Sequence, residues 1–219
     1  MAGRTIAIGD IHGCAAALDT LLQEITPESL DTIVTLGDYI DRGPASRDVL
    51  ERLIRLSDEC ELVPLLGNHE AMLLMALEHD EERTFWLSCG GQETLESYGG
   101  ELDSIPKSHL EFLDRCVASY ETSTHIFLHA NYDPTLPLEE QNEYVLFWKH
   151  LSLDTPKPHV SGRIAVVGHT PQVGGEILDV GHLVCIDTFC YGDARLTALD
   201  VNTRQVWQAS RDGKLWKAT

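Results

Sequence analysis

Five short polar segments recur along the chain in a fixed order, and each follows an apolar run rich in β-branched residues. They are Gly9-Asp10-Ile11-His12-Gly13, Gly37-Asp38-Tyr39-Ile40-Asp41-Arg42-Gly43, Gly67-Asn68-His69-Glu70, Leu128-His129-Ala130 and Gly168-His169-Thr170. Apolar β-branched runs predict strands. Open α/β folds bind their ligands at the carboxyl ends of strands. We therefore expect the Asp, His and Asn side chains of the five segments to converge at one edge of a sheet.

The spacing of the first three segments predicts alternating strands and helices. Asp10, Asp38 and Asn68 lie about 30 residues apart, the length of one βαβ unit. Apolar residues recur at helical spacing between Ala15 and Ile25, and again within Ala45–Ser57. Strands are expected at Thr5–Ile8, Thr32–Leu36, Leu62–Leu66, Thr124–Leu128, Ile164–Val167, Glu176–Asp179, His182–Asp187, Arg195–Asp200 and Gln205–Ala209.

The middle third of the chain has a different pattern. Residues from roughly 70 to 120 are rich in helix formers and are interrupted by glycine pairs, which predicts three or four short helices forming a cap beside the site. A further helix is expected near Glu139–Leu151, and the later strands resemble hairpins, so the sheets should be mixed. No segment resembles a linker, and we expect one α/β domain over residues 1–219.

Composition excludes several classes of function. The 219 residues are 43% hydrophobic, which is enough for one full core. Sixteen basic residues against 35 acidic ones give a net charge of −19, so neither nucleic acid nor a membrane surface is an expected partner. The six scattered cysteines, without CxxC spacing, are typical of reduced thiols. With neither a signal sequence nor a membrane span recognisable, a cytoplasmic protein is expected.

The residue types in the five segments indicate a metal site. Mixed oxygen and imidazole ligands suit a pair of divalent ions better than one tetrahedral zinc. Any one of Asp10, Asp38 and Asn68 could equally be the N-cap of a helix. Taken together with His12 and the later histidines, however, the pattern favours a metal-dependent hydrolase, with Asp38 as the anionic bridge between two metals.

The ordered motifs GDIHG, GDYIDRG, GNHE, HA and GHT resemble those of the phosphoprotein phosphatase family of metallophosphoesterases, in its bacterial serine/threonine form. Asp187-Thr188 and Tyr191-Gly192 resemble the closing segment of bacterial members. The resemblance implies a four-layer αββα sandwich with mixed sheets, two divalent metals, and hydrolysis of phosphomonoesters by a metal-bound hydroxide. Manganese is the expected metal, and iron or zinc would also suit these ligands.

The same resemblance implies a role for each motif residue. Arg42 would bind phosphate through its planar fork, and His69 would protonate the leaving group, held by the carboxylate of Asp41. The implied metal ligands are Asp10, His12 and Asp38 for the first metal, and Asp38, Asn68, His129 and His169 for the second.

The chain also departs from the family pattern. Asn131 stands where glycine is usual, and His150 stands where many bacterial relatives carry a second phosphate-binding arginine. Lys149, His150 and Arg163 are candidates for that missing contact.

Three functions remain open from the sequence. Asp41 and Glu70 favour a phosphoprotein phosphatase, acting on a phosphorylated protein or a small phosphoester. The alternative within the same family is a symmetrical dinucleoside tetraphosphate hydrolase, such as one acting on diadenosine tetraphosphate. A metallophosphoesterase-like fold used only as a binding scaffold is less favoured, because every expected ligand position is filled. The oligomeric state cannot be read from the sequence.

Overall fold

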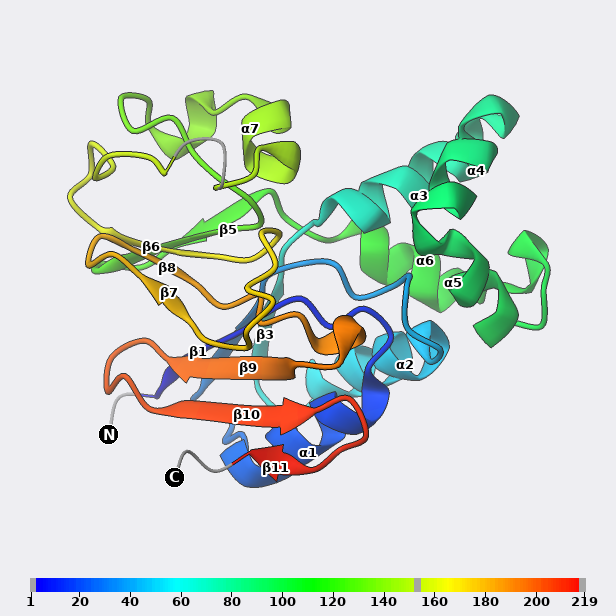
Figure 1. The fold of residues 1–219 in the computed structure, drawn as a ribbon, viewed down its shortest axis with the longest axis horizontal. Helices are drawn as coiled ribbons and strands as arrows, with labels where there is room; N and C mark the ends of the chain where they lie inside the picture. Colours follow the sequence, from blue (N-terminus) through cyan, green and yellow to red (C-terminus); the bar gives the residue numbers. More distant parts are fainter. Residues whose placement is uncertain (1–2, 152–154, 217–219) are drawn as a thin grey trace.

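The computed structural model describes residues 3–151 and 155–216, and within them two mixed sheets lie face to face (Figure 1). The first sheet has the strand order β11 (Leu215–Trp216), β10 (Val206–Ser210), β9 (Arg195–Asp200), β1 (Thr5–Ile8), β2 (Thr32–Thr35) and β3 (Glu61–Pro64). The second has the order β4 (Ser119–Glu121), β5 (His125–Leu128), β6 (Ile164–Val167), β8 (Leu183–Cys185) and β7 (Leu178–Asp179).

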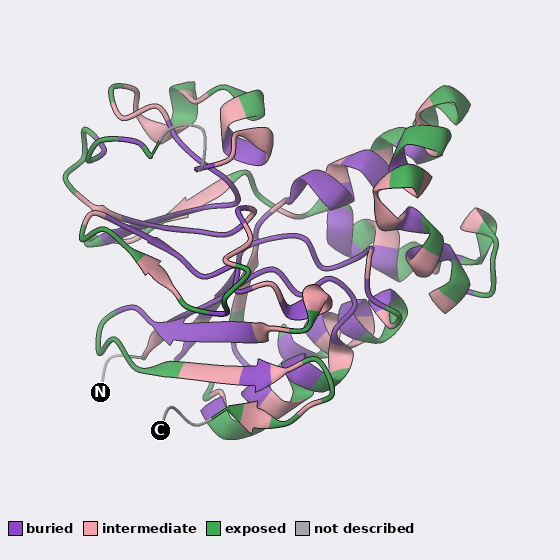
Figure 2. Ribbon diagram, viewed as in Figure 1, coloured by how far each residue is buried: buried purple, intermediate pink, exposed green. Residues whose placement is uncertain are grey.

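Alternating side chains divide the core into layers. In β1, Ile6 and Ile8 pack in the core that contains α1 (Ala15–Ile25) and α2 (Ser46–Leu56), whereas Ala7 packs in the core between the sheets. Phe127 of β5 also lies in the central core, and its neighbours Ile126 and Leu128 pack with residues of α7 (Glu143–Trp148). Figure 2 shows these central strands as almost wholly buried. Because a strand's side chains alternate between its faces, both sheets are covered on both sides, which confirms the predicted αββα sandwich.

The segment after β3 is helical, as expected. It contains α3 (Asn68–Glu78), α4 (Asp80–Trp86), a π-helical turn η1 (Leu87–Gly91), α5 (Gln92–Ser97), a 3₁₀ turn η2 (Leu102–Ser104) and α6 (Lys107–Asp114). The prediction that helix extends to about residue 120 was wrong at its end, because β4 pairs there with β5. The helix expected near Glu139–Leu151 is shorter, a 3₁₀ turn η3 (Leu138–Glu140) followed by α7. No helix in the described part of the chain is long and apolar enough to cross a bilayer.

Strand direction brings the five polar segments together. β1, β2 and β3 pair in parallel in one sheet, and β5, β6 and β8 pair in parallel in the other. The expected hairpins are present as the antiparallel pairs β7–β8 and β9–β10, so both sheets are mixed. The two sheet edges meet where His129 Nδ1 bonds the carbonyl of Leu36 at 2.7 Å. Each polar segment leaves a parallel strand at this shared edge.

Candidate metal centre

Several loop residues at this edge have left-handed backbone conformations, which side chains other than glycine rarely adopt. They are His12 (φ 43°), Asp38 (φ 51°), Asp41 (φ 69°), Arg42 (φ 65°) and His169 (φ 61°). Each such residue costs about 1–3 kcal/mol, so the surrounding structure must hold it in place. Strain of this kind clusters at functional sites.

The buried carboxylate of Glu70 holds two of these loops. Its Oε2 accepts hydrogen bonds from the backbone N–H of Asp38 (2.8 Å) and of Gly67 (3.1 Å). Its Oε1 accepts from the N–H of Tyr39 (2.8 Å) and, more weakly, of Ile40 (3.3 Å). Glu70 lies in the first turn of α3, consistent with a helix start, but it also ties the loop after β2 to the loop after β3.

Three lone pairs converge at the first part of the site. The Asn68 side-chain oxygen lies 3.0 Å from His129 Nε2 and 3.0 Å from His169 Nδ1. The other ring nitrogens face backbone carbonyls, with His129 Nδ1 2.7 Å from Leu36 and His169 Nε2 3.1 Å from Trp148. Carbonyls only accept hydrogen bonds, so each ring donates to its carbonyl and turns a lone pair toward Asn68. Acceptors that face one another in this way fit a cation.

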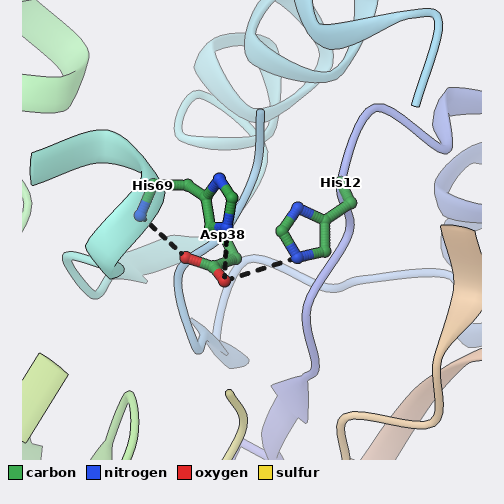
Figure 3. Close-up of side chains that lie close together, drawn as sticks. All are labelled: His12, Asp38 and His69. Carbon is green, nitrogen blue, oxygen red and sulfur yellow. Dashed lines mark hydrogen bonds and ion pairs between the residues drawn. The ribbon is translucent and has the colours of Figure 1, made fainter. Parts of the chain in front are cut away.

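The carboxylate of Asp38 lies between this group and a second one. Its Oδ1 is 3.4 Å from His129 Nε2, and its Oδ2 is 3.4 Å from His12 Nε2 and 4.0 Å from His69 Nε2. Figure 3 shows His12 and His69 on either side of this carboxylate. His12 Nδ1 donates to the Ile40 carbonyl at 2.8 Å, which leaves Nε2 as the ligating atom.

Two sets of potential ligand atoms therefore share Asp38. One contains His12, Asp38 and His69, the other contains Asp38, His129 and His169, and the atoms of each set lie within 4.8 Å of one another. A residue common to both sets is what a bridge between two metals requires.

Asp10 belongs to neither set, and its role as a ligand stays a prediction. Its Oδ2 accepts a hydrogen bond from the N–H of His169 at 2.9 Å, while Oδ1 is buried and has no partner in the described part of the chain. Burial, followed by the charges of Asp187 and Asp38, raises the pKa of Asp10 well above its usual value. A nearby cation would relieve both the unpaired oxygen and the repulsion between these carboxylates.

His129 and His169 are held in their neutral, ligating form. Burial lowers the pKa of His129, and burial followed by the charge of His129 lowers the pKa of His169 to about 3. Burial by itself would raise the pKa of Asp38, but His129, His69 and His12 together hold it well below its usual value. At neutral pH the site thus offers the neutral imidazoles of His129 and His169 and an ionised Asp38 carboxylate, the forms that bind metals.

A second buried cluster surrounds Asp41. Its Oδ2 lies 2.7 Å from His69 Nδ1 and accepts from the indole N–H of Trp86 at 3.0 Å, while its Oδ1 accepts from the Thr94 hydroxyl at 2.7 Å. His69 Nε2 faces Asp38 and has no hydrogen-bond partner within residues 3–151 and 155–216. Trp86 and Thr94 were not predicted as site residues, because they lie far along the chain and belong to no motif.

The guanidinium of Arg42 lies at the edge of the site. Its Nη1 donates to His12 Nε2 at 3.1 Å and to the Tyr191 hydroxyl at 3.0 Å, and its charged carbon sits 4.7 Å from the centre of the Tyr191 ring. Asp187, two residues after β8, is also buried here, and burial raises its pKa to about 6. Sequence reasoning noted Asp187 and Tyr191 as a family segment, left open whether Tyr191 borders the pocket or packs in the core, and assigned Asp187 no role.

The three candidates for a second phosphate contact lie in different places. The His150 ring is 4.4 Å from the His169 ring, so it adjoins the metal centre. Arg163 precedes β6, at the end of the strand opposite His169, and pairs with Glu121 at 2.7 Å. Lys149 lines a separate pocket with Tyr132. Position therefore favours His150 and argues against Arg163.

We expect the metal-free protein to lose stability as pH rises from about 6.5 to 8. Burial, and then the charge of Asp38, raises the pKa of Glu70 to about 8. The stability that Glu70 contributes is fully present below its pKa in the unfolded chain, and it is lost as pH rises through 8. His129 and His169 have lowered pKa values and titrate with the opposite sign, below pH 6.5. The free energy of unfolding should fall by up to about 1.4 kcal/mol per pH unit.

Urea unfolding of the EDTA-dialysed protein at several pH values measures this slope, with manganese-loaded protein as the control. Bound cations favour the ionised carboxylate, so the loaded protein should show a shallower dependence on pH. A metal-free protein whose stability is flat or rises over this window would contradict the expectation.

Parts of this sequence are similar to known phosphoesterases. The sequence pattern of calcineurin-like phosphoesterases matches residues 3–194. The symmetrical bis(5'-nucleosyl)-tetraphosphatase of Paracidovorax citrulli is 50% identical over 70 residues, which is 32% of this chain and 24% of that protein. Serine/threonine-protein phosphatase 2 of Escherichia coli is 41% identical over 86 residues, 38% of this chain and 37% of that protein. The matches therefore span about a quarter of the first of these curated relatives and somewhat more than a third of the second.

A solved structure shows the same fold over nearly the whole chain. The crystal structure of a proposed diadenosine tetraphosphatase superposes with a TM-score of 0.73 at 23% sequence identity, covering 95% of this chain and 94% of the other. At this identity the likeness establishes the fold and leaves the substrate open.

Proposed function

The chain belongs to the calcineurin-like phosphoesterase family, and from this premise we propose that it is a dinuclear-metal-dependent phosphatase of phosphoserine and phosphothreonine in proteins or peptides. Members of the family use divalent metals. Residues His12, Asp38, Asn68, His129 and His169 would hold the pair here, with Asp10 beside them. Divalent cations bound there would supply a water of lowered pKa and neutralise charge on the phosphoryl oxygens.

The observation that supports phosphomonoester hydrolysis best is the His69–Asp41 pair at 2.7 Å. Serine and threonine leave as alkoxides, which are poor leaving groups unless a proton reaches the oxygen during bond cleavage. With Nδ1 donating to Asp41, the free Nε2 of His69 points toward the metal centre. Trp86 and Thr94 fix the carboxylate, so the imidazole is held in one orientation.

Arg42 supplies the expected phosphate contact. Its guanidinium reaches His12 Nε2, the nitrogen that faces Asp38, and it also contacts the Tyr191 hydroxyl and ring. A permanently charged planar fork binds two phosphoryl oxygens at once. Tyr191 limits the rotamers of Arg42, and this reduces the entropy lost when phosphate binds.

Symmetrical hydrolysis of dinucleoside tetraphosphates is the second candidate function. It is favoured by the local match to the tetraphosphatase of Paracidovorax citrulli, at 50% identity over 70 residues. In that reaction the leaving group is a nucleotide phosphate, which departs far more readily without protonation than an alkoxide does. That reaction therefore depends less on a carboxylate-held imidazole. The His69–Asp41 pair thus favours phosphomonoesters as substrates.

A three-substrate assay tests the proposal. Protein stripped with EDTA and reloaded with manganese is given p-nitrophenyl phosphate, a phosphoserine peptide and diadenosine tetraphosphate, and kcat/KM is measured for each. The proposal expects metal-dependent hydrolysis of the first two, with the peptide preferred over the dinucleotide. Hydrolysis of the dinucleotide without the peptide would overturn it, and inactivity on all three would indicate a binding scaffold.

A further inference from the structure

An apolar pocket of about 370 Å³ lies outside the metal centre, between α3 and α4 on one side and α7 on the other. Its apolar walls include Leu66, Met72, Met75, Phe85, Phe147 and Trp148. The charged side chains that line it are two carboxylates, Glu82 of α4 and Glu143 of α7. The elements on both sides can be followed in Figure 1.

One wall of this pocket begins at a predicted metal ligand, and the other is hydrogen-bonded to one. Helix α3 starts at Asn68 and carries Met72 one turn later. On the other side, the backbone carbonyl of Trp148 accepts the hydrogen bond from His169 Nε2 at 3.1 Å. The pocket therefore adjoins the metal centre, where the phosphate of a substrate would sit.

The pocket presents apolar surface to solvent. Met75 and Phe85 are 47% and 51% exposed, although both are large apolar side chains. Exposed apolar surface gathered in a concave pocket marks a binding site more often than scattered exposed residues do. An apolar side chain placed there would cover both residues and leave no polar group of its own unpaired.

The charges at the pocket discriminate between ligand classes. Glu82 and Glu143 attract cations and repel phosphates, and the net charge of −19 acts in the same direction at longer range. A nucleobase presents several ring-nitrogen acceptors, whereas Trp148 is the one pocket-lining side chain with an N–H donor. A dinucleotide would also bring additional phosphates toward the two carboxylates.

We infer that this pocket binds an apolar side chain of the substrate next to the phosphorylated residue, and that Glu82 and Glu143 select substrates with a basic residue beside it. The inference rests on the proposed function and names its substrate class, phosphopeptides with apolar and basic flanking residues. The apolar contact would contribute affinity, and the two carboxylates would add specificity and steer the encounter.

Four phosphoserine peptides test the inference. All four have the same length. On one side of the phosphoserine they carry leucine or alanine, and on the other side arginine or glutamine. The wild-type protein should favour the leucine–arginine peptide over the alanine–glutamine peptide by about tenfold or more in kcat/KM. The arginine part of this preference should shrink at high salt.

Substitutions in the pocket test whether its lining residues cause the preference for leucine and the preference for arginine. Phe85→Ser should bring the leucine-to-alanine ratio of kcat/KM close to one, and the double variant Glu82→Gln/Glu143→Gln should do the same for the arginine-to-glutamine ratio. A ratio is independent of the amount of active protein in each preparation. The matched control is Glu81→Gln/Glu140→Gln, which changes two exposed carboxylates of neighbouring segments that do not line the pocket.

The outcomes separate this inference from the function on which it rests. Peptides that are hydrolysed equally well, or preferences that survive the variants, would overturn the pocket assignment while the phosphatase proposal stands. Hydrolysis of p-nitrophenyl phosphate and diadenosine tetraphosphate without any phosphopeptide would overturn both. Preferences that disappear in the pocket variants and persist in the control would support both.

Discussion

Replacing His69 by asparagine is expected to lower kcat on a phosphoserine peptide by about 10²–10⁴-fold, the usual contribution of a positioned general acid. The buried Nε2 of His69 faces Asp38, and among the residues that the structure describes it has no hydrogen-bond partner. The loss should be much smaller on p-nitrophenyl phosphate, because p-nitrophenolate leaves without a proton. Steady-state kinetics on both substrates, with metal content measured on the same samples, check this result.

The metal content decides between two roles for His69. As a general acid it should leave both metals bound when it is replaced. The same nitrogen also lies in one potential ligand set with His12 and Asp38. Equal losses on both substrates, together with loss of a metal, would make His69 a ligand and contradict the general-acid role. His79→Asn, at an exposed histidine outside the site, is the control and should behave as wild type.

Replacing Asp38 by asparagine is expected to have the largest effect. The change removes the one side chain common to both potential ligand sets, and with it the negative charge between two cations. We expect fewer than two metals per chain and a fall in kcat/KM of about 10³-fold or more, because both activation of water and charge neutralisation depend on the pair. Metal analysis, combined with the same two-substrate kinetics, measures both effects.

The fold should survive this change, so the result can be interpreted. Asparagine has nearly the same shape as aspartate, and the backbone N–H of residue 38 keeps its bond to Glu70. Asp103→Asn, an exposed carboxylate away from the site, provides the matched control. A variant at Asp38 that keeps two metals and wild-type kcat/KM would exclude the bridging role.

Much of the fold follows from local patterns in the sequence. Runs such as Ile6-Ala7-Ile8 predict strands buried on both faces, and the structure confirms this. The short edge strands β4 and β11 were not predicted, because a segment of two or three residues becomes a strand only through its neighbour. Their formation depends on tertiary pairing, which no local pattern records.

The candidate site likewise has a part that the sequence predicts and a part that depends on tertiary packing. The motifs brought Asp38, Asn68, His129 and His169 together as expected. The expectation of one edge of a single sheet was wrong, because the first two residues follow strands of one sheet and the histidines follow strands of the other. Trp86 and Thr94 reach Asp41 from helices of the middle third, and their contacts depend on how those helices pack. The four bonds of Glu70 could have been suspected only from its place in the first turn of α3.

The candidate ligands come from both sheets, with Asp38 and Asn68 after strands of the first and His129 and His169 after strands of the second. A cation held among them acts as a cross-link between the two halves of the sandwich. Its binding energy then opposes separation of the halves, since the site exists only while they are docked. The availability of metal would thus affect the stability of the folded chain as well as its activity.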